Sequence, residues 1–417
     1  MRLLIFSQYF WPENFRVNDL CEAMEAAGHE VTVLTGWPNY PEGKFLPAFR
    51  ANRAQFGQYG GAKIHRVPVF PRGSSTVGML LNYLSFIISA TLLAPWKLRR
   101  TEFDAIFFFE TSPITSVLPA IWLRFLRRKP LFLWVLDLWP ETLSSLGVVK
   151  SSRWLGLVGR LVSFIYKRCD AILIQSRAFA ESIAHYAGTR DKTRYFPGWP
   201  EPIFVDFDAD QPIAPELSGF ADRFVVLFAG NIGEAQDFPA IIDAAVALRD
   251  RDEVVFIVIG DGRAAAAAIQ AVKDKALEDR IVFLGRYPLE RMPSFFAGAD
   301  ALLVSLKDEL TFRLTIPGKV QSYLAVGKPI LAMLTGEGAR VIAESGSGLC
   351  APASDGAALA RNIMTLFNME KQDRHVMGCA GQAYCHREFD RAQSVRAVEA
   401  ELESYQTARG DKTSTES

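Results

Sequence analysis

Four glycine-containing loops follow one another in the second half of this 417-residue chain. They are Gly230-Asn-Ile-Gly233, Gly260-Asp-Gly262, Gly285-Arg-Tyr-Pro288 and Pro317-Gly-Lys319. Their spacing of roughly 25 to 35 residues is that of βαβ units. At the carboxyl edge of a parallel sheet, such loops present backbone N–H groups at the starts of helices, where phosphates bind. Each loop alone is explained as well by a tight turn, but four in series predict a nucleotide-binding half.

Side chains in and beside these loops suit a nucleotide diphosphate. Asn231 and Gln236 supply hydrogen-bond donors, and Arg286-Tyr287 stands where a nucleobase would stack or pair. Lys319 would stabilise a departing phosphate, with Arg340 as a second cation, although both are equally explained as solvated surface charges. The predicted nucleotide-binding residues are Gly230, Asn231, Gly233, Gln236, Gly260, Asp261, Gly262, Arg286, Tyr287, Glu337, Gly338 and Arg340.

Carboxylates and aromatic rings gather at strand ends in the first half. The segments are Tyr9-Phe-Trp-Pro-Glu-Asn-Phe-Arg16, Trp37-Pro-Asn-Tyr-Pro-Glu-Gly43 and Asp137-Leu-Trp-Pro-Glu141. Such rings suit a sugar face, and carboxylates can orient a hydroxyl group; helix capping beside a tryptophan is the alternative. We expect Asp137 at a catalytic position, and Glu13, Asn14, Arg16, Tyr40, Trp139 and Glu141 on the acceptor side.

Apolar segments alternate with helical patterns in both halves. Strands are predicted at 3–7, 31–35, 64–68, 105–109, 131–136 and 171–175, and again at 224–229, 254–259, 281–284, 301–305 and 330–333. This alternation predicts an α/β protein with two doubly wound parallel sheets. Three prolines and a glycine between Tyr195 and Pro202 mark the boundary. The expected domains are 1–200 and 201–385, followed by a helix and tail at 386–417 that is disordered from Gly410.

Residues Val77 to Trp96 form an uncharged run of twenty residues. As a helix of about 30 Å it is long enough to span a bilayer core. Gly78, Asn82, Ser85 and Ser89 form one small, polar stripe, which leaves open a core helix, a helix in the membrane plane and a true span. Spanning would divide one sheet between two compartments. The cations that follow at Lys97 to Arg100 favour the in-plane helix, which would place the protein on a membrane through about Val77 to Arg100.

The composition limits the partners, the compartment and the kinds of chemistry that the chain can have. Residues 1–200 carry 24 Lys+Arg against 14 Asp+Glu, and the rest carry 22 against 32, so opposite charges of +10 and −10 cancel. Base-stacking aromatic residues do not interleave with the basic run, which disfavours nucleic acid. Five scattered cysteines and a short first apolar segment predict a reducing cytosol without export. No Walker A, GxSxG or HExxH motif occurs, so nucleotide hydrolysis, triad and zinc chemistry are not indicated.

The chain resembles glycosyltransferase family 4, the retaining enzymes with two Rossmann-like domains facing a cleft, known as GT-B. The motifs are Gln8-Tyr-Phe-Trp-Pro-Glu13, Pro38-Asn-Tyr-Pro-Glu-Gly43, Asp137-Leu-Trp-Pro-Glu141, Gly230-Asn-Ile-Gly-Glu-Ala-Gln236 and Ser322-Tyr-Leu-Ala-Val-Gly-Lys-Pro329. They are most similar to a subgroup that builds O-antigen, capsule and colanic-type polysaccharides, within it the WbuB-type N-acetyl-L-fucosamine transferases. The resemblance implies a UDP-sugar donor and a polyprenyl-diphosphate-linked GlcNAc acceptor at the inner face of the cytoplasmic membrane. It implies no metal and no cofactor.

The chain departs from the family pattern at three positions. The resemblance implies two glutamates, the second binding ribose, where this chain has Leu314 and Ser322, and a histidine where it has Leu136. These departures leave two alternatives open: an inactive GT-B scaffold that binds nucleotide or lipid, and a UDP-sugar 2-epimerase.

Overall fold

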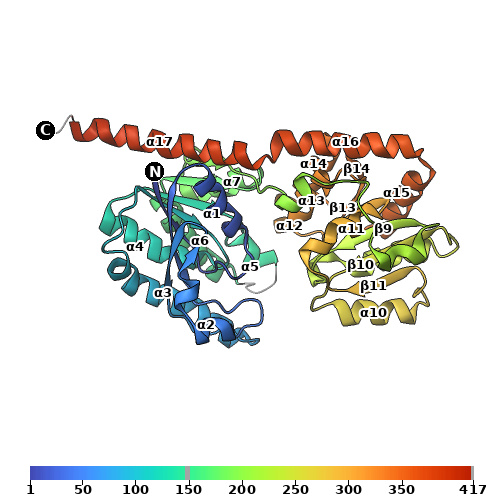
Figure 1. Cartoon of the computed structure of the whole chain (residues 1–417), viewed down its shortest axis with the longest axis horizontal. Helices are drawn as coiled ribbons and strands as arrows, with labels where there is room; N and C mark the ends of the chain where they lie inside the picture. Colours follow the sequence, from blue (N-terminus) through green and yellow to red (C-terminus); the bar gives the residue numbers. More distant parts are fainter. Residues whose placement is uncertain (146–150, 415–417) are drawn as a thin grey trace. The chain divides into compact units, whose positions relative to one another are not determined.

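The computed structural model describes residues 1–145 and 151–414. The chain forms two compact units (Figure 1). Unit 1 comprises Met1–Phe196 together with the C-terminal segment from Arg391, and unit 2 comprises Pro197–Asp390. Each unit is an open sheet with helices on both faces, as expected for two Rossmann-like halves.

Unit 1 contains an eight-stranded sheet in the order β3-β4-β2-β1-β5-β6-β7-β8. All pairs are parallel except β3 with β4. The strands are β1 (Arg2–Phe6), β2 (Glu30–Gly36), β3 (Gln58–Tyr59), β4 (Ala62–Val67), β5 (Ala105–Phe109), β6 (Leu131–Val135), β7 (Ala171–Ile174) and β8 (Thr193–Tyr195). The six predicted strands are confirmed, whereas β3 and β8 have only two and three residues and no apolar pattern to reveal them.

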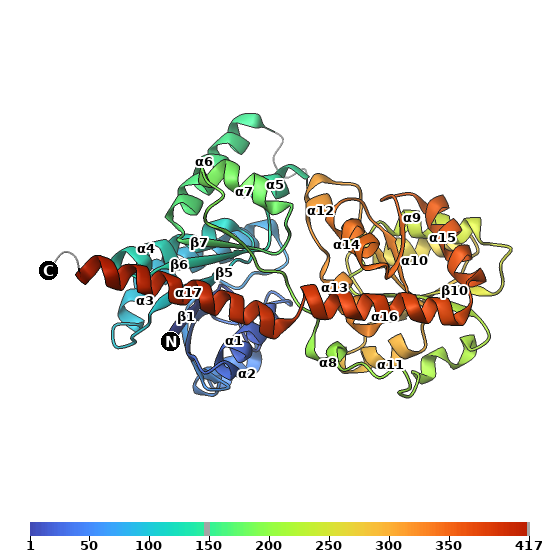
Figure 2. The ribbon, with the colours of Figure 1, turned by 90° about the horizontal axis from the view of Figure 1, so that it is seen from above.

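The helices of unit 1 include one from the far end of the chain. They are α1 (Arg16–Ala26), α2 (Pro47–Ala51), α3 (Thr76–Lys97), α4 (Leu118–Arg127), α5 (Glu141–Ser145), α6 (Ser152–Arg168), α7 (Phe179–Ala187) and α17 (Arg391–Ser414). Figure 2 shows α17 lying along the unit. His29 pairs with Glu399 at 2.8 Å, and Arg194 pairs with Glu401 at 2.8 Å. Helix α17 extends to Ser414, residues 415–417 lie outside the described residues, and the disorder expected from Gly410 stays a prediction.

Helix α3 contains the long apolar run, and its polar stripe faces the protein. Asn82 is fully buried, followed by Phe86, Ala90 and Ala94 at helical spacing. The large side chains on the opposite side are exposed: Val77, Leu80, Leu81, Leu84, Ile88, Leu92 and Trp96. By length and composition α3 is one helix that can cross a membrane, and 22% of its most apolar window is buried. It is therefore not an enclosed core helix.

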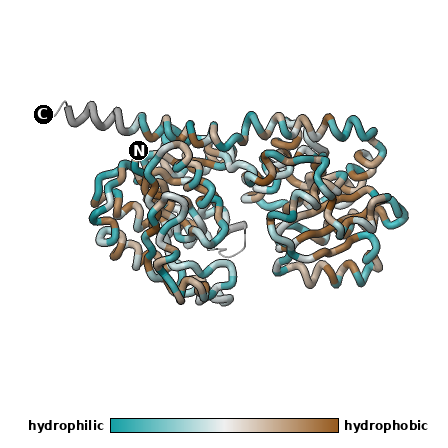
Figure 3. The backbone as a smooth tube through the Cα atoms, in the orientation of Figure 1, coloured by the Kyte–Doolittle hydropathy of each residue, from teal (hydrophilic) through white to brown (hydrophobic). Residues whose placement is uncertain are grey.

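Unit 2 contains a six-stranded parallel sheet in the order β11-β10-β9-β12-β13-β14. The strands are β9 (Phe224–Ala229), β10 (Val254–Ile259), β11 (Ile281–Gly285), β12 (Ala301–Ser305), β13 (Ile330–Met333) and β14 (Gly348–Ala351). The helices are α8 (Pro202–Val205), α9 (Phe238–Ala247), α10 (Ala265–Asp274), α11 (Met292–Ala297), α12 (Leu310–Leu314), α13 (Gly318–Val326), α14 (Glu337–Ser345), α15 (Gly356–Asn368) and α16 (Lys371–Glu388). The strands are the brown centre of the unit in Figure 3, and alternate residues enter the cores on the two faces.

Candidate functional site

The loops after β9 and β10 lie against one another at the carboxyl edge of the unit 2 sheet. Gly230 and Gly260 have φ values of 132° and 143°, a region that side chains disfavour. A Cβ at Gly260 would lie 1.8 Å from the carbonyl oxygen of Gly230, so only glycine permits this approach. The predicted nucleotide-binding glycines are thus brought together.

Three backbone N–H groups of the first loop already have partners within the protein. The N–H of Gly230 donates to the Ile259 carbonyl at 2.8 Å, and that of Ile232 donates to the Asp261 carbonyl at 2.9 Å. The N–H of Gly233 donates to the Gln236 side chain at 3.0 Å. We expected these amides to face a diphosphate, but in this structure they close the loop instead.

Lys319 at the start of α13 reaches back toward β9. Its ammonium nitrogen lies 3.5 Å from the centroid of the Phe228 ring. A Cβ on Gly230 would lie 2.6 Å from the Lys319 Cε, so the glycine also makes room for this lysine. Burial lowers the pKa of Lys319 to about 7. This cation lies beside two predicted glycine loops, at the place where an anionic group would favour its charged form.

The second predicted cation is already paired. The Arg340 guanidinium donates to both Glu337 carboxylate oxygens, at 2.9 and 3.0 Å, and to Glu344 at 2.5 Å. These carboxylates hold its pKa above the usual value. Arg340 is therefore paired within its own helix, and its contact with a ligand stays a prediction. Gly338 brings α14 close to Pro317, because a Cβ there would lie 3.0 Å from the proline Cδ.

The residues after β11 follow a strand end that is tied to the second glycine loop, because the N–H of Gly260 donates to the Gly285 carbonyl at 2.8 Å. Tyr287 packs against Phe295, with ring centroids 4.8 Å apart, and is part of the border of a hydrophobic core. Its ring is therefore used in packing, contrary to the expectation that it stacks on a base. Arg286 is exposed beside it. Asp261 accepts the N–H of Gly262 at 2.7 Å.

A carboxylate that the sequence analysis missed lies next to Ser322. The Ser322 hydroxyl donates to Glu201 Oε2 at 2.5 Å and to the Gly318 carbonyl at 3.2 Å. Glu201 is half-buried and lies in the proline-rich segment that the sequence predicts as the domain boundary. The position expected to carry a glutamate thus has a carboxylate bound to it from another part of unit 2.

Glu13 in unit 1 holds two loops together. Its Oε1 accepts the N–H groups of Asn39 at 2.6 Å and Tyr40 at 2.7 Å, and its side chain is almost fully buried. Burial raises the pKa of Glu13 to about 7, which the backbone hydrogen bonds and Arg66 partly oppose. These backbone contacts make Glu13 a residue that positions the two loops, and its role in orienting an acceptor stays a prediction.

The remaining predicted residues of these loops differ in their surroundings. Tyr40 belongs to an aromatic cluster with Tyr9 and Phe15, with ring centroids 5.6 and 5.1 Å away. Asn14 is exposed, and Arg16 is half-buried. The cluster is tied to α3, because Tyr9 donates to Asn82 Oδ1 at 3.0 Å. Helix α3 therefore contacts the predicted acceptor-side edge directly.

Asp137 is oriented by two residues at the end of β5. The Ser112 hydroxyl donates to Asp137 Oδ2 at 2.6 Å. Glu110 Oε2 accepts the N–H groups of Leu136 at 3.1 Å and Asp137 at 3.4 Å, and this carboxyl is completely buried. Burial and the neighbouring Asp137 raise the pKa of Glu110 well above the usual value. Glu110 was missed, although its place directly after an apolar strand was a usable signal.

Trp139 and Glu141 belong to the same segment after β6 as Asp137. Glu141 Oε1 accepts the Ser182 hydroxyl at 2.5 Å. Its Oε2 and the Trp139 indole nitrogen are buried without a hydrogen-bond partner in the described part of the chain. Within residues 1–145 and 151–414, no group of three or more His, Cys, Asp or Glu side chains is arranged to hold a metal ion.

Two family models match these two units. Residues 14–199 match the glycosyl transferase 4-like domain, and residues 223–369 match the glycosyl transferases group 1 model. A probable glycosyltransferase of Pseudomonas aeruginosa, WbjE, is 31% identical over 304 residues, which cover 70% of this chain and 74% of WbjE. The chain belongs to the group 1 glycosyltransferases with a family 4-like N-terminal domain.

Further relatives agree with this assignment. The putative colanic acid biosynthesis glycosyl transferase WcaI of Escherichia coli is 24% identical, with 78% of this chain and 82% of WcaI covered. Anabaena HepE in complex with UDP superimposes with a TM-score of 0.69 at 16% identity, over 97% of this chain and all of HepE. Sucrose-phosphate synthase of Thermosynechococcus elongatus has a TM-score of 0.73 at 16% identity, over 98% of this chain and 99% of its own. The fold is GT-B.

Proposed function

We propose that this glycosyltransferase moves a sugar from UDP to a polyprenyl-diphosphate-linked GlcNAc in surface polysaccharide synthesis, with retention at the anomeric carbon. The observation that carries the proposal is Lys319, a half-buried lysine with a pKa lowered to about 7 beside the glycine loops of β9 and β10. A diphosphate at this place would restore the lysine's charge. HepE, a structural neighbour, was crystallised with UDP and with UDP-glucose, which supports UDP as the nucleotide to test.

In the proposed reaction, the bond between the anomeric carbon and the diphosphate oxygen breaks as the acceptor oxygen bonds to that carbon. The acceptor proton passes to the departing diphosphate, so no protein base is needed. Lys319 stabilises the charge that develops on the leaving UDP. Asp137, held by Ser112, faces the acceptor side in this scheme.

Glu201 replaces the ribose-binding glutamate in this proposal. Ser322 is too short to reach a ribose as a glutamate would, but it holds the Glu201 carboxylate at 2.5 Å. A carboxylate accepts hydrogen bonds from both hydroxyls of a vicinal diol. The chain thus supplies the same chemical group from a different segment, which favours an active enzyme over an inactive scaffold.

The exposed apolar side of α3 supports a peripheral location on the inner face of the cytoplasmic membrane. Leu80, Leu84, Ile88 and Leu92 are between 45 and 70% exposed, and Lys97, Arg99 and Arg100 follow them. Apolar side chains that lie in lipid beside cations that face anionic headgroups are typical of in-plane helices. A lipid-linked acceptor would be presented at the same surface.

A donor panel tests the proposal. Purified protein is incubated with UDP-N-acetyl-L-fucosamine, the first donor we would choose, and with other UDP-sugars in the presence of polyprenyl-diphosphate-GlcNAc. We expect a disaccharide lipid whose new linkage keeps the donor's anomeric configuration. Nucleotide binding without transfer from any donor would favour the scaffold. Release of a free epimerised sugar without an acceptor would favour the 2-epimerase.

A further inference from the structure

A basic cavity opens at the edge of unit 1 opposite the strand ends that carry the predicted acceptor side. Its volume is about 380 Å³, and its lining includes Arg124, Phe125, Arg128, Lys129, Asp170 and Tyr405. It lies where β6 and β7 begin, because Leu131 opens β6 and Asp170 directly precedes β7. The residues come from the end of α4, the β7 edge and α17, three segments that only the folded unit brings together.

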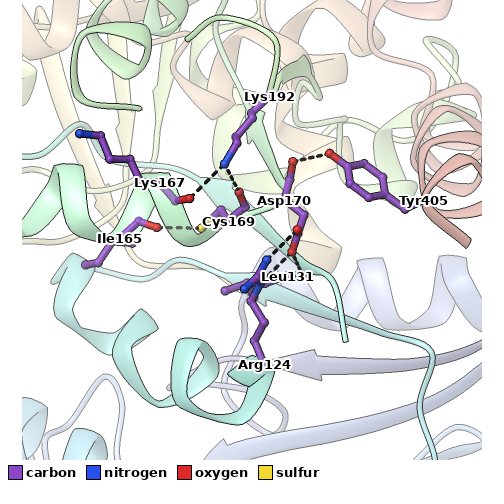
Figure 4. A network of polar contacts seen from close by, with 8 residues as sticks. All are labelled: Arg124, Leu131, Ile165, Lys167, Cys169, Asp170, Lys192 and Tyr405. Atoms are coloured by element: carbon purple, nitrogen blue, oxygen red, sulfur yellow. Dashed lines mark hydrogen bonds and ion pairs between the residues drawn. The ribbon is translucent and has the colours of Figure 1, made fainter. Parts of the chain in front are cut away.

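The acid in this cavity is already neutralised. Figure 4 shows Asp170 at the centre of a polar network. Arg124 donates two hydrogen bonds to its carboxylate, both at 2.8 Å, and the N–H of Leu131 donates a third at 2.8 Å. Tyr405 donates to the Asp170 carbonyl from α17. The network builds one wall of the cavity and pairs Asp170, the one acid among the described lining residues, so this lining keeps an excess of positive charge.

Arg128 and Lys129 supply that excess. Neither has an ion pair with any acid in the described residues, and Arg128 is exposed. Arg128 also caps α4 in the left-handed region, with φ 51° and ψ 41°. Helices that end in this conformation usually have glycine there, since a side chain is disfavoured. The backbone conformation therefore does not favour arginine at this position. Its positive charge is the property that the conformation leaves unexplained.

Apolar side chains border the cavity on α4. Phe125, a lining residue, is 71% exposed, and it stacks on Trp122, which is 42% exposed, with ring centroids 6.0 Å apart. Arg127 ties α4 to the end of α3 by donating to the Leu98 and Thr101 carbonyls at 3.0 and 2.8 Å. The exposed apolar residues of α3 and α4 thus belong to adjoining helices. Aromatic rings next to cations are typical of surfaces at a membrane interface, where the rings enter lipid and the cations lie at the level of the headgroups.

We infer that this cavity binds the phosphate of an anionic phospholipid headgroup, with Arg128 and Lys129 as the phosphate ligands and Trp122 and Phe125 in the adjoining acyl region. The inference rests on the membrane association proposed above. It adds a defined headgroup site to the general attraction between basic residues and anionic lipid. Bidentate guanidinium contacts suit a phosphate diester, and Lys129 adds a point charge. A free phosphate offers the same chemistry, so the experiment separates the two sources.

The experiment measures binding of the full-length protein to vesicles of phosphatidylcholine with and without phosphatidylglycerol, in the absence of sugar nucleotide. Arg128→Gly is the informative variant, because glycine suits the left-handed backbone and should keep or raise Tm while removing the charge. We expect it to weaken binding to phosphatidylglycerol vesicles about tenfold or more. Arg100→Gln, exposed nearby but outside the cavity, is the matched control and should lose about fivefold or less, the effect of one surface charge.

Equal losses for the two variants would overturn the inference, because attraction would then be diffuse. Inorganic phosphate and glycerol 1-phosphate at millimolar concentration form the second arm. We expect the protein to stay bound to vesicles when these phosphates are present. If they release the protein from vesicles, and Arg128→Gly abolishes this release, the cavity would be assigned to soluble phosphates instead. Because no donor is present, a lack of transferase activity would overturn the proposed function without changing these outcomes.

Discussion

The ammonium nitrogen of Lys319 lies 3.5 Å from the centre of the Phe228 ring, across the backbone of Gly230. A lysine in this position is held by a ring face instead of a carboxylate, and burial lowers its pKa to about 7. Burial therefore disfavours the charged form of this amine in the free protein. A ligand that brings negative charge would favour the charged form.

Replacing Lys319 with methionine should lower transfer by two to three orders of magnitude, since one preorganised cation at a leaving group is worth about that much. Methionine keeps the apolar stem against Phe228, so Tm should change little. Steady-state kinetics with a lipid-linked acceptor measure the effect. Unchanged turnover in a folded variant would remove Lys319 from the mechanism.

UDP binding should also be linked to a proton. At pH 8, Lys319 is mostly neutral in the free protein, because its pKa is about 7. The diphosphate raises that pKa, so binding takes up a proton, and affinity falls as pH rises above 7. Titration calorimetry in two buffers of different ionisation enthalpy should detect an uptake approaching one proton. Lys319→Met should show none from this site, and an equal uptake in the variant would contradict the assignment.

The contact between Ser322 and Glu201 predicts how the nucleotide's ribose is recognised. Glu201→Gln should weaken UDP binding about tenfold, because hydrogen bonds to a charged acceptor contribute about 1.5–3 kcal/mol. It should also abolish the preference for UDP over 2′,3′-dideoxy-UDP. Ser322→Ala should have a smaller effect, since the carboxylate remains. The exchange Ser322→Glu with Glu201→Ser should recover binding, and a preference that survives Glu201→Gln would show that another group recognises ribose.

Glu13 should act on stability and not on acceptor recognition. Its folded-state pKa is raised to about 7, so its stabilising effect is complete below the unfolded value near 4.5 and is lost as pH rises through about 7. Glu13→Gln retains an oxygen for the Asn39 and Tyr40 amides and should flatten the pH dependence of unfolding free energy between pH 4.5 and 7. Glu13→Ala should cost about 2–4 kcal/mol. Urea denaturation across this range measures both, and a Glu13→Gln variant that folds normally but lacks transfer would restore a role at the acceptor.

Much of the fold was predictable because buried parallel strands are continuous apolar runs. Strand β9 coincides with the apolar run Phe224–Ala229, and the glycine that follows marks the sheet edge. Strand β14 was missed because it is not a continuous buried apolar run: Gly348 and Leu349 are half-buried and Cys350 is exposed. Short edge strands depend on neighbouring strands for their hydrogen bonds, so the pattern of apolar residues in the sequence does not reveal them.

The candidate site was less predictable, because it depends on which hydrogen-bond and ion-pair partners the side chains have in the folded protein. Arg340 has acids three residues before it and four after it on the same helical face, a local pattern that favours ion pairing and was overlooked. The Glu201 contact joins residues 121 positions apart, and no local pattern indicates it. The orientation of α3 is a similar case, because its polar stripe faces inward to meet Gln8 and Tyr9, whose amide and hydroxyl need a buried acceptor.

The exposed side of α3 predicts a separation of membrane binding from folding. Leu84, Ile88 and Leu92 are 45, 59 and 70% exposed, so replacing all three with serine removes little packing and should leave Tm unchanged or higher. If each side chain contributes about 1 kcal/mol by entering lipid, the triple variant should bind vesicles on the order of 100-fold more weakly. Phe86→Ala is the control on the buried side, where truncation should cost about 3–5 kcal/mol of stability and leave partitioning of the folded fraction intact. Flotation assays and thermal unfolding on both variants distinguish the two faces. A triple variant that unfolds, or that remains on vesicles, would mean that this side of α3 packs against protein and not against lipid.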